Sequence, residues 1–140
     1  MPDKLIDTNI LVYAYDCSEG EKHAVSRDLL KQIWKEGGGV VSLQNLMEFF
    51  VVITKKVDSP VAVIEAKTIV EDFLKSDNWR IIDRDVDTFL NAIDVVSEYG
   101  IHLWDAIIVA CMKENGIIDI VTENKKDFEK IPDIKVSVPF

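Results

Sequence analysis

Three acidic residues occur where acids are otherwise scarce. Asp7 directly follows the apolar pair Leu5-Ile6, Glu48 interrupts the apolar run 46–53, and Asp105 begins the apolar run 105–111. An acid within an apolar segment needs a hydrogen-bond partner or a cation, because burying an unpaired charge is very costly. Hard divalent cations such as Mg²⁺ take oxygen ligands, which carboxylates and water supply. The three positions therefore predict a site for Mg²⁺ or Mn²⁺.

Each acid also has a plain structural alternative. Asp7 and Asp105 could each cap the helix that follows, a role that stabilises a helix by about 1 kcal/mol. Glu48 could face solvent or pair with a lysine. However, Gln44, Asn45 and Glu48 are spaced to share one polar stripe on a helix that is apolar on nearly every other side, which predicts a buried Glu48. Taken together, the three acids favour a common site over three separate structural roles.

The remaining metal-ligating residue types do not form a zinc pattern. Neither histidine belongs to a His-x₃-His pair, and only His102 is close in sequence to a candidate acid. Cys17 and Cys111 form no Cys-x-x-Cys pair, and we expect Cys111 to be a small buried apolar residue. This composition favours Mg²⁺ or Mn²⁺ over zinc.

The elements that must position these acids are alternating helices and strands. Apolar spacing predicts helices over 8–15, 21–35, 43–54, 61–75, 85–99 and 104–114, and strands over 5–6, 40–42, 79–82, 117–121 and 135–138. The glycines 37–39 precede a strand, so we interpret them as a helix stop and not as a phosphate-binding loop. The alternation predicts one α/β domain over residues 1–140 with a mostly parallel sheet. Functional groups of such sheets gather beyond the carboxyl ends of the strands, where Asp7 and the turn 122–124 should meet.

Composition restricts the possible partners. A hydrophobic content of 48% indicates a globular protein, and no apolar run reaches the roughly 18 residues that span a membrane. The N-terminus has no signal-like stretch, so we expect a cytoplasmic protein with no membrane association. A net charge of −9 argues against binding nucleic acid through bulk positive charge. An acidic nuclease would therefore need divalent cations between its carboxylates and the phosphates.

Two further charged motifs could bind an ion or a phosphate, but their patterns are weaker. The segment 83–87 begins like an EF-hand loop, but Thr88 occupies the position that requires glycine and Asp94 the position that requires glutamate. We interpret it as the acidic beginning of a helix, capped by Asp85. The pair Lys125-Lys126 flanks the proposed site and could contact phosphate, although an exposed lysine pair is usually only solubilising.

Four short motifs, in this order and spacing, resemble the PIN domain family. They are Asp7-Thr8-Asn9 after a short strand, Glu48 in an apolar helix, Leu103-Trp104-Asp105-Ala106 at the beginning of a helix, and Thr122-Glu123-Asn124 followed by Asp127-Phe128. The chain is most similar to the VapC group of toxin-antitoxin ribonucleases, and the resemblance covers essentially the whole chain. It implies a Rossmann-like fold, Mg²⁺- or Mn²⁺-dependent endoribonuclease activity on RNA, a homodimer and a protein antitoxin that blocks the site.

The resemblance also assigns roles to residues. It implies that Asp7, Glu48 and Asp105 bind the metal and act in catalysis, and that Thr8 and Asn9 support them or orient the substrate. The family's fourth acidic position falls nearest Asn124, a neutral residue, with Asp127 one helical turn further on. Asp127 could compensate for the missing charge or could merely cap the segment before Phe128. One bound metal ion is therefore favoured over two.

Hydrolysis by this family implies products with 5′-phosphate and 3′-hydroxyl ends. Two alternatives to a toxin remain open at this point. One is a PIN nuclease of RNA maturation or quality control. The other is a degenerate PIN module that binds a partner without catalysis, which the neutral Asn124 makes conceivable.

Overall fold

Five short strands form one fully parallel sheet. The structure, a computed structural model, describes residues 2–140. The strands are β1 (Lys4–Ile6), β2 (Gly39–Ser42), β3 (Trp79–Ile82), β4 (Asp119–Val121) and β5 (Lys135–Ser137). They lie in the order β3-β2-β1-β4-β5, and every neighbouring pair is parallel. The predicted α/β class is confirmed, and the sheet is parallel throughout.

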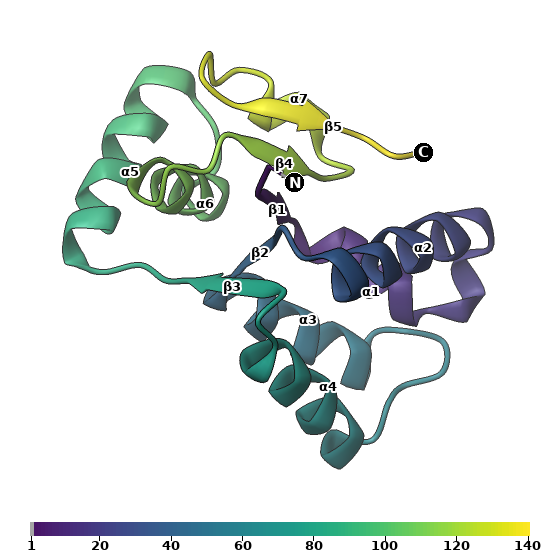
Figure 1. Cartoon of the computed structure of the whole chain (residues 1–140). Coiled ribbons are helices and arrows are strands. Elements are labelled where there is room, and N and C mark those ends of the chain that lie inside the picture. Colours follow the sequence, from purple (N-terminus) through teal and green to yellow (C-terminus); the bar gives the residue numbers. More distant parts are fainter. Residues whose placement is uncertain (1) are drawn as a thin grey trace.

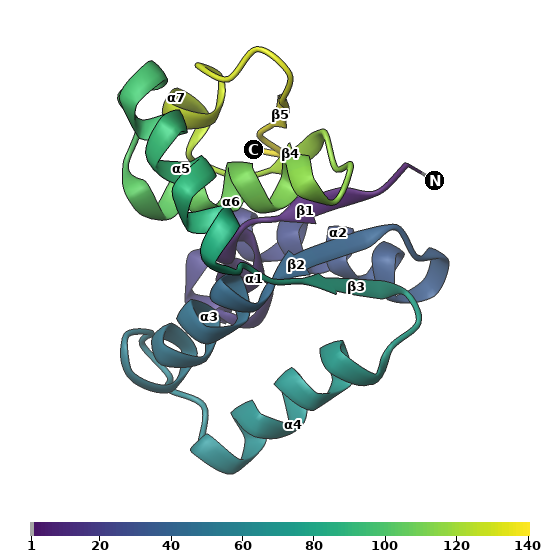
Figure 2. The same cartoon turned by 90° about the vertical axis from the view of Figure 1, so that its left-hand side faces the viewer.

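Helices cover both faces of this sheet. The helices are α1 (Thr8–Tyr15), α2 (Glu21–Glu36), α3 (Leu43–Lys55), α4 (Val63–Lys75), α5 (Val86–Tyr99), α6 (Leu103–Glu114) and α7 (Lys125–Phe128), with a 3-10 turn η1 (Cys17–Glu19) after α1. The helices α1 to α4 lie on one face, and α5 and α6 lie on the other (Figures 1 and 2). The sheet is therefore the middle layer of three.

Alternating residues of the strands supply the two apolar cores. Leu5, Val40 and Ile120 are fully buried against the layer of α5 and α6. Their neighbours Ile6 and Val41 are fully buried on the opposite side, against α1, α2 and α3. Successive strand residues point to opposite faces, so a short, wholly apolar strand can fill both cores.

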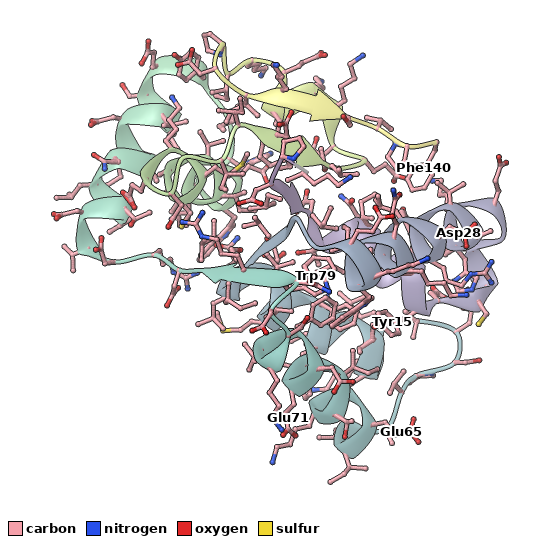
Figure 3. The ribbon with its side chains drawn as sticks, viewed as in Figure 1. Tyr15, Asp28, Glu65, Glu71, Trp79 and Phe140 are labelled. Atoms are coloured by element: carbon pink, nitrogen blue, oxygen red, sulfur yellow. The ribbon has the colours of Figure 1, made fainter. Side chains whose placement is uncertain are left out.

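Aromatic rings strengthen the core on the α1–α4 face. The Phe73 ring lies 4.9 Å from the rings of Trp34 and Trp79, and Phe49 packs against Tyr15 at 5.4 Å. Figure 3 labels two of these residues, Tyr15 and Trp79. These pairs are tilted or edge-to-face, the arrangements that aromatic quadrupoles favour. The cluster joins α1, α2, α3 and α4 to the edge strand β3.

Element boundaries differ from the predicted ones at a few positions. The helix predicted from residue 61 begins at Val63, because the Val61 N–H instead donates to the Ile53 carbonyl. The strand predicted over 117–121 is shorter, and η1 and α7 are additional elements. Gly37 ends α2 in a left-handed conformation with φ of 85°, which confirms the predicted helix stop.

No single helix in residues 2–140 is long and apolar enough to cross a membrane, although α5 and α6, bent by 116°, meet the length and composition criteria as a pair. Cys111 is buried and free, as predicted, and Cys17 is exposed and free.

Candidate active site

The candidate site lies where the parallel strands end. Asp7 follows β1, Thr122 follows β4, and the turn with Arg84 follows β3, while Ser42 closes β2 and caps α3. Because neighbouring parallel strands end on the same side, these residues reach one edge of the sheet. Asp105 joins them from the first turn of α6.

Asp7 is held by hydrogen bonds on both carboxylate oxygens. Its Oδ1 accepts from the Thr8 N–H at 2.8 Å and from Asn45 Nδ2 at 3.2 Å. Its Oδ2 accepts from Thr122 Oγ1 at 2.7 Å, with Asn9 Nδ2 at 3.5 Å. Burial raises the pKa of the Asp7 carboxyl, and these hydrogen bonds act against the rise. Asp7 therefore caps α1 and at the same time anchors the site.

Asn45 connects Asp7 to the beginning of α3. It is fully buried, and its Oδ1 accepts from the Ser42 N–H and hydroxyl in a reciprocal capping arrangement. Its Nδ2 donates to Asp7 Oδ1 and to Thr8 Oγ1 at 3.0 Å. One amide thus fixes the relative positions of β2, α3 and the Asp7 carboxylate.

The turn after β4 is fixed by residues from α1 and α2. The Glu123 N–H donates to Asn9 Oδ1 at 3.1 Å. The Glu123 carboxylate accepts from the Tyr13 hydroxyl at 2.9 Å and lies 2.8 Å from Lys22 Nζ. The Asn124 N–H donates to Thr122 Oγ1 at 2.9 Å. This turn therefore presents Asn124 to the site in a defined position.

Asp105 lies among other acids. Asn124 Nδ2 donates to Asp105 Oδ2 at 3.1 Å and lies 3.5 Å from Asp127 Oδ2. Burial, hydrogen bonding to Asp127 and the negative charges of Asp7 and Asp127 raise the pKa of the Asp105 carboxyl to about 7. The residue that caps α6 is His102, without a side-chain hydrogen bond, so Asp105 does not have the capping role that was its structural alternative.

Glu48 is exposed, and the prediction that it would be buried is wrong. Helix α3 is not apolar on every side: Met47, Glu48 and Val51 form a strip that faces solvent. Gln44 Nε2 donates to Glu48 Oε1 at 3.0 Å, so the predicted polar stripe exists. Partial desolvation raises the pKa of the Glu48 carboxyl, the Gln44 hydrogen bond lowers it, and the Asp7 charge raises it. Glu48 therefore faces the acidic edge from its solvent side.

The donor set suits a hard cation. Its charged oxygens come from Asp7, Asp105 and Asp127, with Glu48 beside them, and a cation would offset the mutual repulsion that raises the pKa of Asp105. In residues 2–140, however, no three of these acids approach closely enough to form a ready-made metal cage. The residues fit Mg²⁺ or Mn²⁺ held by few carboxylates and completed by water.

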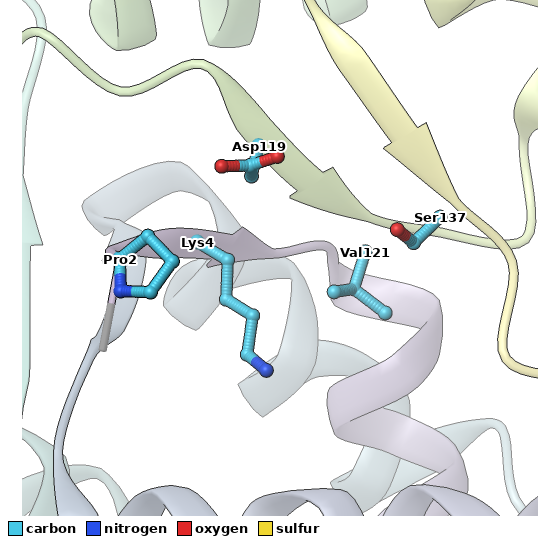
Figure 4. Close-up of a pocket in the computed structure, with 5 residues that line it drawn as sticks. All are labelled: Pro2, Lys4, Asp119, Val121 and Ser137. Carbon is cyan, nitrogen blue, oxygen red and sulfur yellow. The ribbon is translucent and has the colours of Figure 1, made fainter.

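The acids do not line the hollow beside β1, β4 and β5. A hollow of about 290 Å³ beside β1, β4 and β5 is lined by Pro2, Lys4, Asp119, Val121 and Ser137 (Figure 4). It contains none of the candidate site residues, and Asp119 lies at the beginning of β4, away from the carboxyl edge. The candidate site is therefore separate from this hollow.

Sequence reasoning missed two contributors. Arg84 Nη1 donates to Gln44 Oε1 at 3.2 Å, which places a cation beside Glu48. Thr122 was noted only as part of a turn, although it donates the shortest hydrogen bond to Asp7. The rule that placed Asp7 would have found Arg84 too, since Arg84 also follows a strand of the parallel sheet.

Comparisons with known proteins identify the family to which this fold belongs. The PIN domain family model matches residues 4–134. No curated protein shows a significant sequence match to the chain. Among solved structures, a toxin-antitoxin complex from Klebsiella pneumoniae is 25% identical, with a TM-score of 0.71, over 99% of this chain and 98% of that chain.

Two further solved structures share the fold at lower identity. VapC20 from Mycobacterium tuberculosis, a sarcin-ricin loop cleaving toxin, is 14% identical, with a TM-score of 0.69 over 89% of this chain and 92% of that one. DNA-bound VapBC from Salmonella typhimurium is 20% identical, with a TM-score of 0.68 over 98% of each chain. With a parallel α/β sheet, acids at its carboxyl edge and a family match over nearly the whole chain, the protein belongs to the PIN domain family.

Proposed function

We propose that this PIN domain is a Mg²⁺- or Mn²⁺-dependent endoribonuclease and the toxin of a VapBC-type toxin-antitoxin pair. The observation that carries the proposal is the proximity of acids at the carboxyl edge of the sheet: Asn124 Nδ2 reaches both Asp105 and Asp127, and the charge of Asp7 raises the pKa of Asp105. Their shared negative charge suits a divalent cation and phosphodiester chemistry. The structural relatives from toxin-antitoxin systems support the assignment to a toxin.

In this proposal Asp7 and Asp105 hold the cation and Glu48 contributes from α3. The cation would supply Lewis-acid activation of the scissile phosphate and of the attacking water. Thr8 and Asn9 keep Asp7 in position, the first through Asn45 and the second through the turn at Glu123. Asn124 orients Asp105 and takes the fourth position of the site, with Asp127 supplying the charge that Asn124 lacks.

Cleavage of RNA in Mg²⁺ or Mn²⁺, with and without a chelator, tests the activity. We expect metal-dependent cleavage that leaves 5′-phosphate ends, and its loss in Asp7→Asn and Asp105→Asn. Asp119→Asn is the matched control, because it removes an acid from the same sheet away from the site. A wild type that cleaves no better than the two site variants would refute the nuclease and leave the non-catalytic PIN module, which the neutral Asn124 favours.

An antitoxin has a suitable surface on α3 and α4. A groove of about 550 Å³ between them is lined by Met47, Phe50, Val51, Val70 and Leu74, among others. Met47, Val51 and Leu74 are roughly half exposed, which is unfavourable unless a partner covers them. Expression should arrest growth, and the product of a small upstream reading frame should relieve the arrest. Leu74→Glu should weaken this relief without reducing cleavage. A nuclease of RNA maturation would have no such relieving partner.

A second copy of the chain has a suitable surface on α5. Val86, Phe89, Leu90 and Ile93 are exposed and spaced as one helical stripe. We propose that this stripe forms the homodimer interface. Leu90→Asp should shift the mass measured by light scattering from dimer to monomer, whereas a wild type that is already monomeric would refute the proposal.

A further inference from the structure

Arg84 is a half-buried cation beside Glu48 that forms no ion pair in residues 2–140, although its charge lowers the pKa of the Glu48 carboxyl. Arg27 pairs with Asp28, and Arg80 lies 3.9 Å from the Asp3 carboxylate. None of the ion pairs in the described part of the chain includes Arg84, whose Nη1 donates only to the neutral Gln44 side chain. In a chain with a net charge of −9, an arginine left without a carboxylate is available for an anion from outside.

Gln44 links this arginine to the beginning of α6. Its side chain is 7% exposed, and all its hydrogen-bonding groups are used. Oε1 accepts from Arg84, while Nε2 donates to Glu48 Oε1 at 3.0 Å and to the Trp104 carbonyl oxygen at 3.3 Å. A fully used, buried amide is a rigid connector. It therefore fixes Arg84 and the Trp104 backbone relative to each other and to the acids.

Trp104 presents its ring to solvent beside Asp105. Its side chain is 61% exposed, whereas Trp79 is 4% exposed and Trp34 packs against Phe73. Trp104 directly precedes Asp105 in the first turn of α6, where the two side chains leave the helix about 100° apart. An exposed indole in such a position can stack on a nucleic-acid base, an interaction that every base offers through its π-face.

We propose that Arg84, Gln44 and Trp104 form a subsite for one unpaired nucleotide next to the acidic site. Arg84 contacts a backbone phosphate, Trp104 stacks on the base, and Gln44 positions both. The inference rests on the proposed nuclease function and names residues of this chain that would bind a nucleotide beside the acids. Stacking on an indole needs a base that is not enclosed in a duplex, so the preferred substrate is a single strand or a loop.

Steady-state cleavage of a short single-stranded RNA tests the subsite. Trp104→Leu and Arg84→Gln should each raise KM about tenfold with little change in kcat, since stacking and phosphate contacts act on substrate binding. Trp104→Phe and Arg84→Lys should retain part of the affinity. Ile118→Ala and Arg80→Gln are matched controls: Ile118 is similarly exposed, and Arg80 comes from the same strand that precedes Arg84. Both controls should cleave like the wild type.

A binding measurement separates the subsite from the nuclease function. Trp104 is the exposed tryptophan of the chain, so its fluorescence should be the fraction that acrylamide quenches. In an Asp105→Asn background, single-stranded RNA should protect this fraction, and a duplex of the same sequence should not. Protection by both, or unchanged KM in an active Trp104→Leu enzyme, would overturn the subsite alone. A Trp104→Leu protein that changes mass in light scattering with unchanged KM would assign the ring to a protein interface and also overturn it. A wild type without metal-dependent cleavage would refute the nuclease, even if RNA protects Trp104.

Discussion

Asp7 and Asp105 lie on the same edge of the sheet, but hydrogen-bond donors surround one carboxylate and acids adjoin the other. Thr8, Asn45 and Thr122 all donate to Asp7. Within the described part of the chain, Asp105 has a single amide donor, Asn124, and lies beside Asp127. Burial raises the pKa of both carboxyls, but the neighbours of Asp7 oppose the rise, whereas those of Asp105 increase it.

The difference separates two tasks that a carboxylate can have in one site. The donors around Asp7 come from α1, α3 and the turn after β4, so this side chain joins three separate parts of the fold. Asp105 has few hydrogen bonds that could stabilise the fold. Its acidic neighbours concentrate negative charge that a cation would stabilise. Asp7 is therefore both structural and functional, and Asp105 is chiefly functional.

The largest expected effect is the loss of cleavage in both acid variants, combined with a difference in stability. Asp7→Asn and Asp105→Asn should each lower kcat/KM at least about 100-fold if both residues hold the metal. Only Asp7→Asn should also lower the free energy of unfolding, by about 1–3 kcal/mol, because an amide nitrogen would face the donors around it. Urea unfolding of the metal-free proteins measures this. Equal losses of stability in both variants would show that the surroundings of Asp7 and Asp105 do not differ in their contribution to the fold.

The next effect concerns the donors around Asp7. Thr122→Val removes the 2.7 Å hydrogen bond to Asp7 Oδ2 and should lower the free energy of unfolding by about 1–2 kcal/mol. Thr68→Val is the matched control, since the Thr68 hydroxyl bonds only to its own helix on an exposed surface. Similar unfolding curves for the two variants would show that the buried Thr122 hydroxyl contributes no more to stability than an exposed hydroxyl.

A third substitution adds an acid next to Asp105. Asn124→Asp replaces the amide donor of Asp105, the only one in residues 2–140, with a carboxylate. We expect Mg²⁺ or Mn²⁺ to bind about tenfold more tightly in calorimetric titration, since affinity rises with the number of charged ligands. The metal-free variant should be less stable than the wild type because of the added repulsion. Unchanged metal affinity would place the cation away from Asn124.

The smallest effect is a pH dependence of the metal-free protein. The folded-state pKa of Asp105 is raised from the ordinary 3.8 to about 7, so the fold favours its protonated form. The contribution of Asp105 to stability should therefore fall as the pH rises from 3.8 to 7. The difference in unfolding free energy between Asp105→Asn and the wild type should grow over this range, and saturating Mg²⁺ should reduce it. A difference that is constant with pH would contradict the raised pKa.

Local sequence patterns predicted most elements of the fold, and the boundary that was missed depends on a contact with another element. The glycine after α2 and the Asp85 cap of α5 set helix ends that were predicted, because these signals act within a few residues. The beginning of α4 was placed two residues early, because the Val61 N–H pairs with α3, a contact that no local pattern reveals.

The sequence by itself determined the parallel α/β class, the position of Asp7 at a strand end and the presence of Asp105 at the beginning of an apolar helix. Each of these follows from the spacing of apolar residues, from helix-capping residues, or from the rule that neighbouring parallel strands end on the same side of the sheet. Only the tertiary structure decided the environments of the site residues. It exposed Glu48, whose apolar helix had suggested burial, because α3 packs with one face only. It also surrounded Asp7 with donors, set Asp105 against Asp127 and joined Arg84 to Trp104 through Gln44, contacts between residues far apart in the chain. The sequence gives the type of each side chain, but its charge state and its partners depend on which distant segments pack around it.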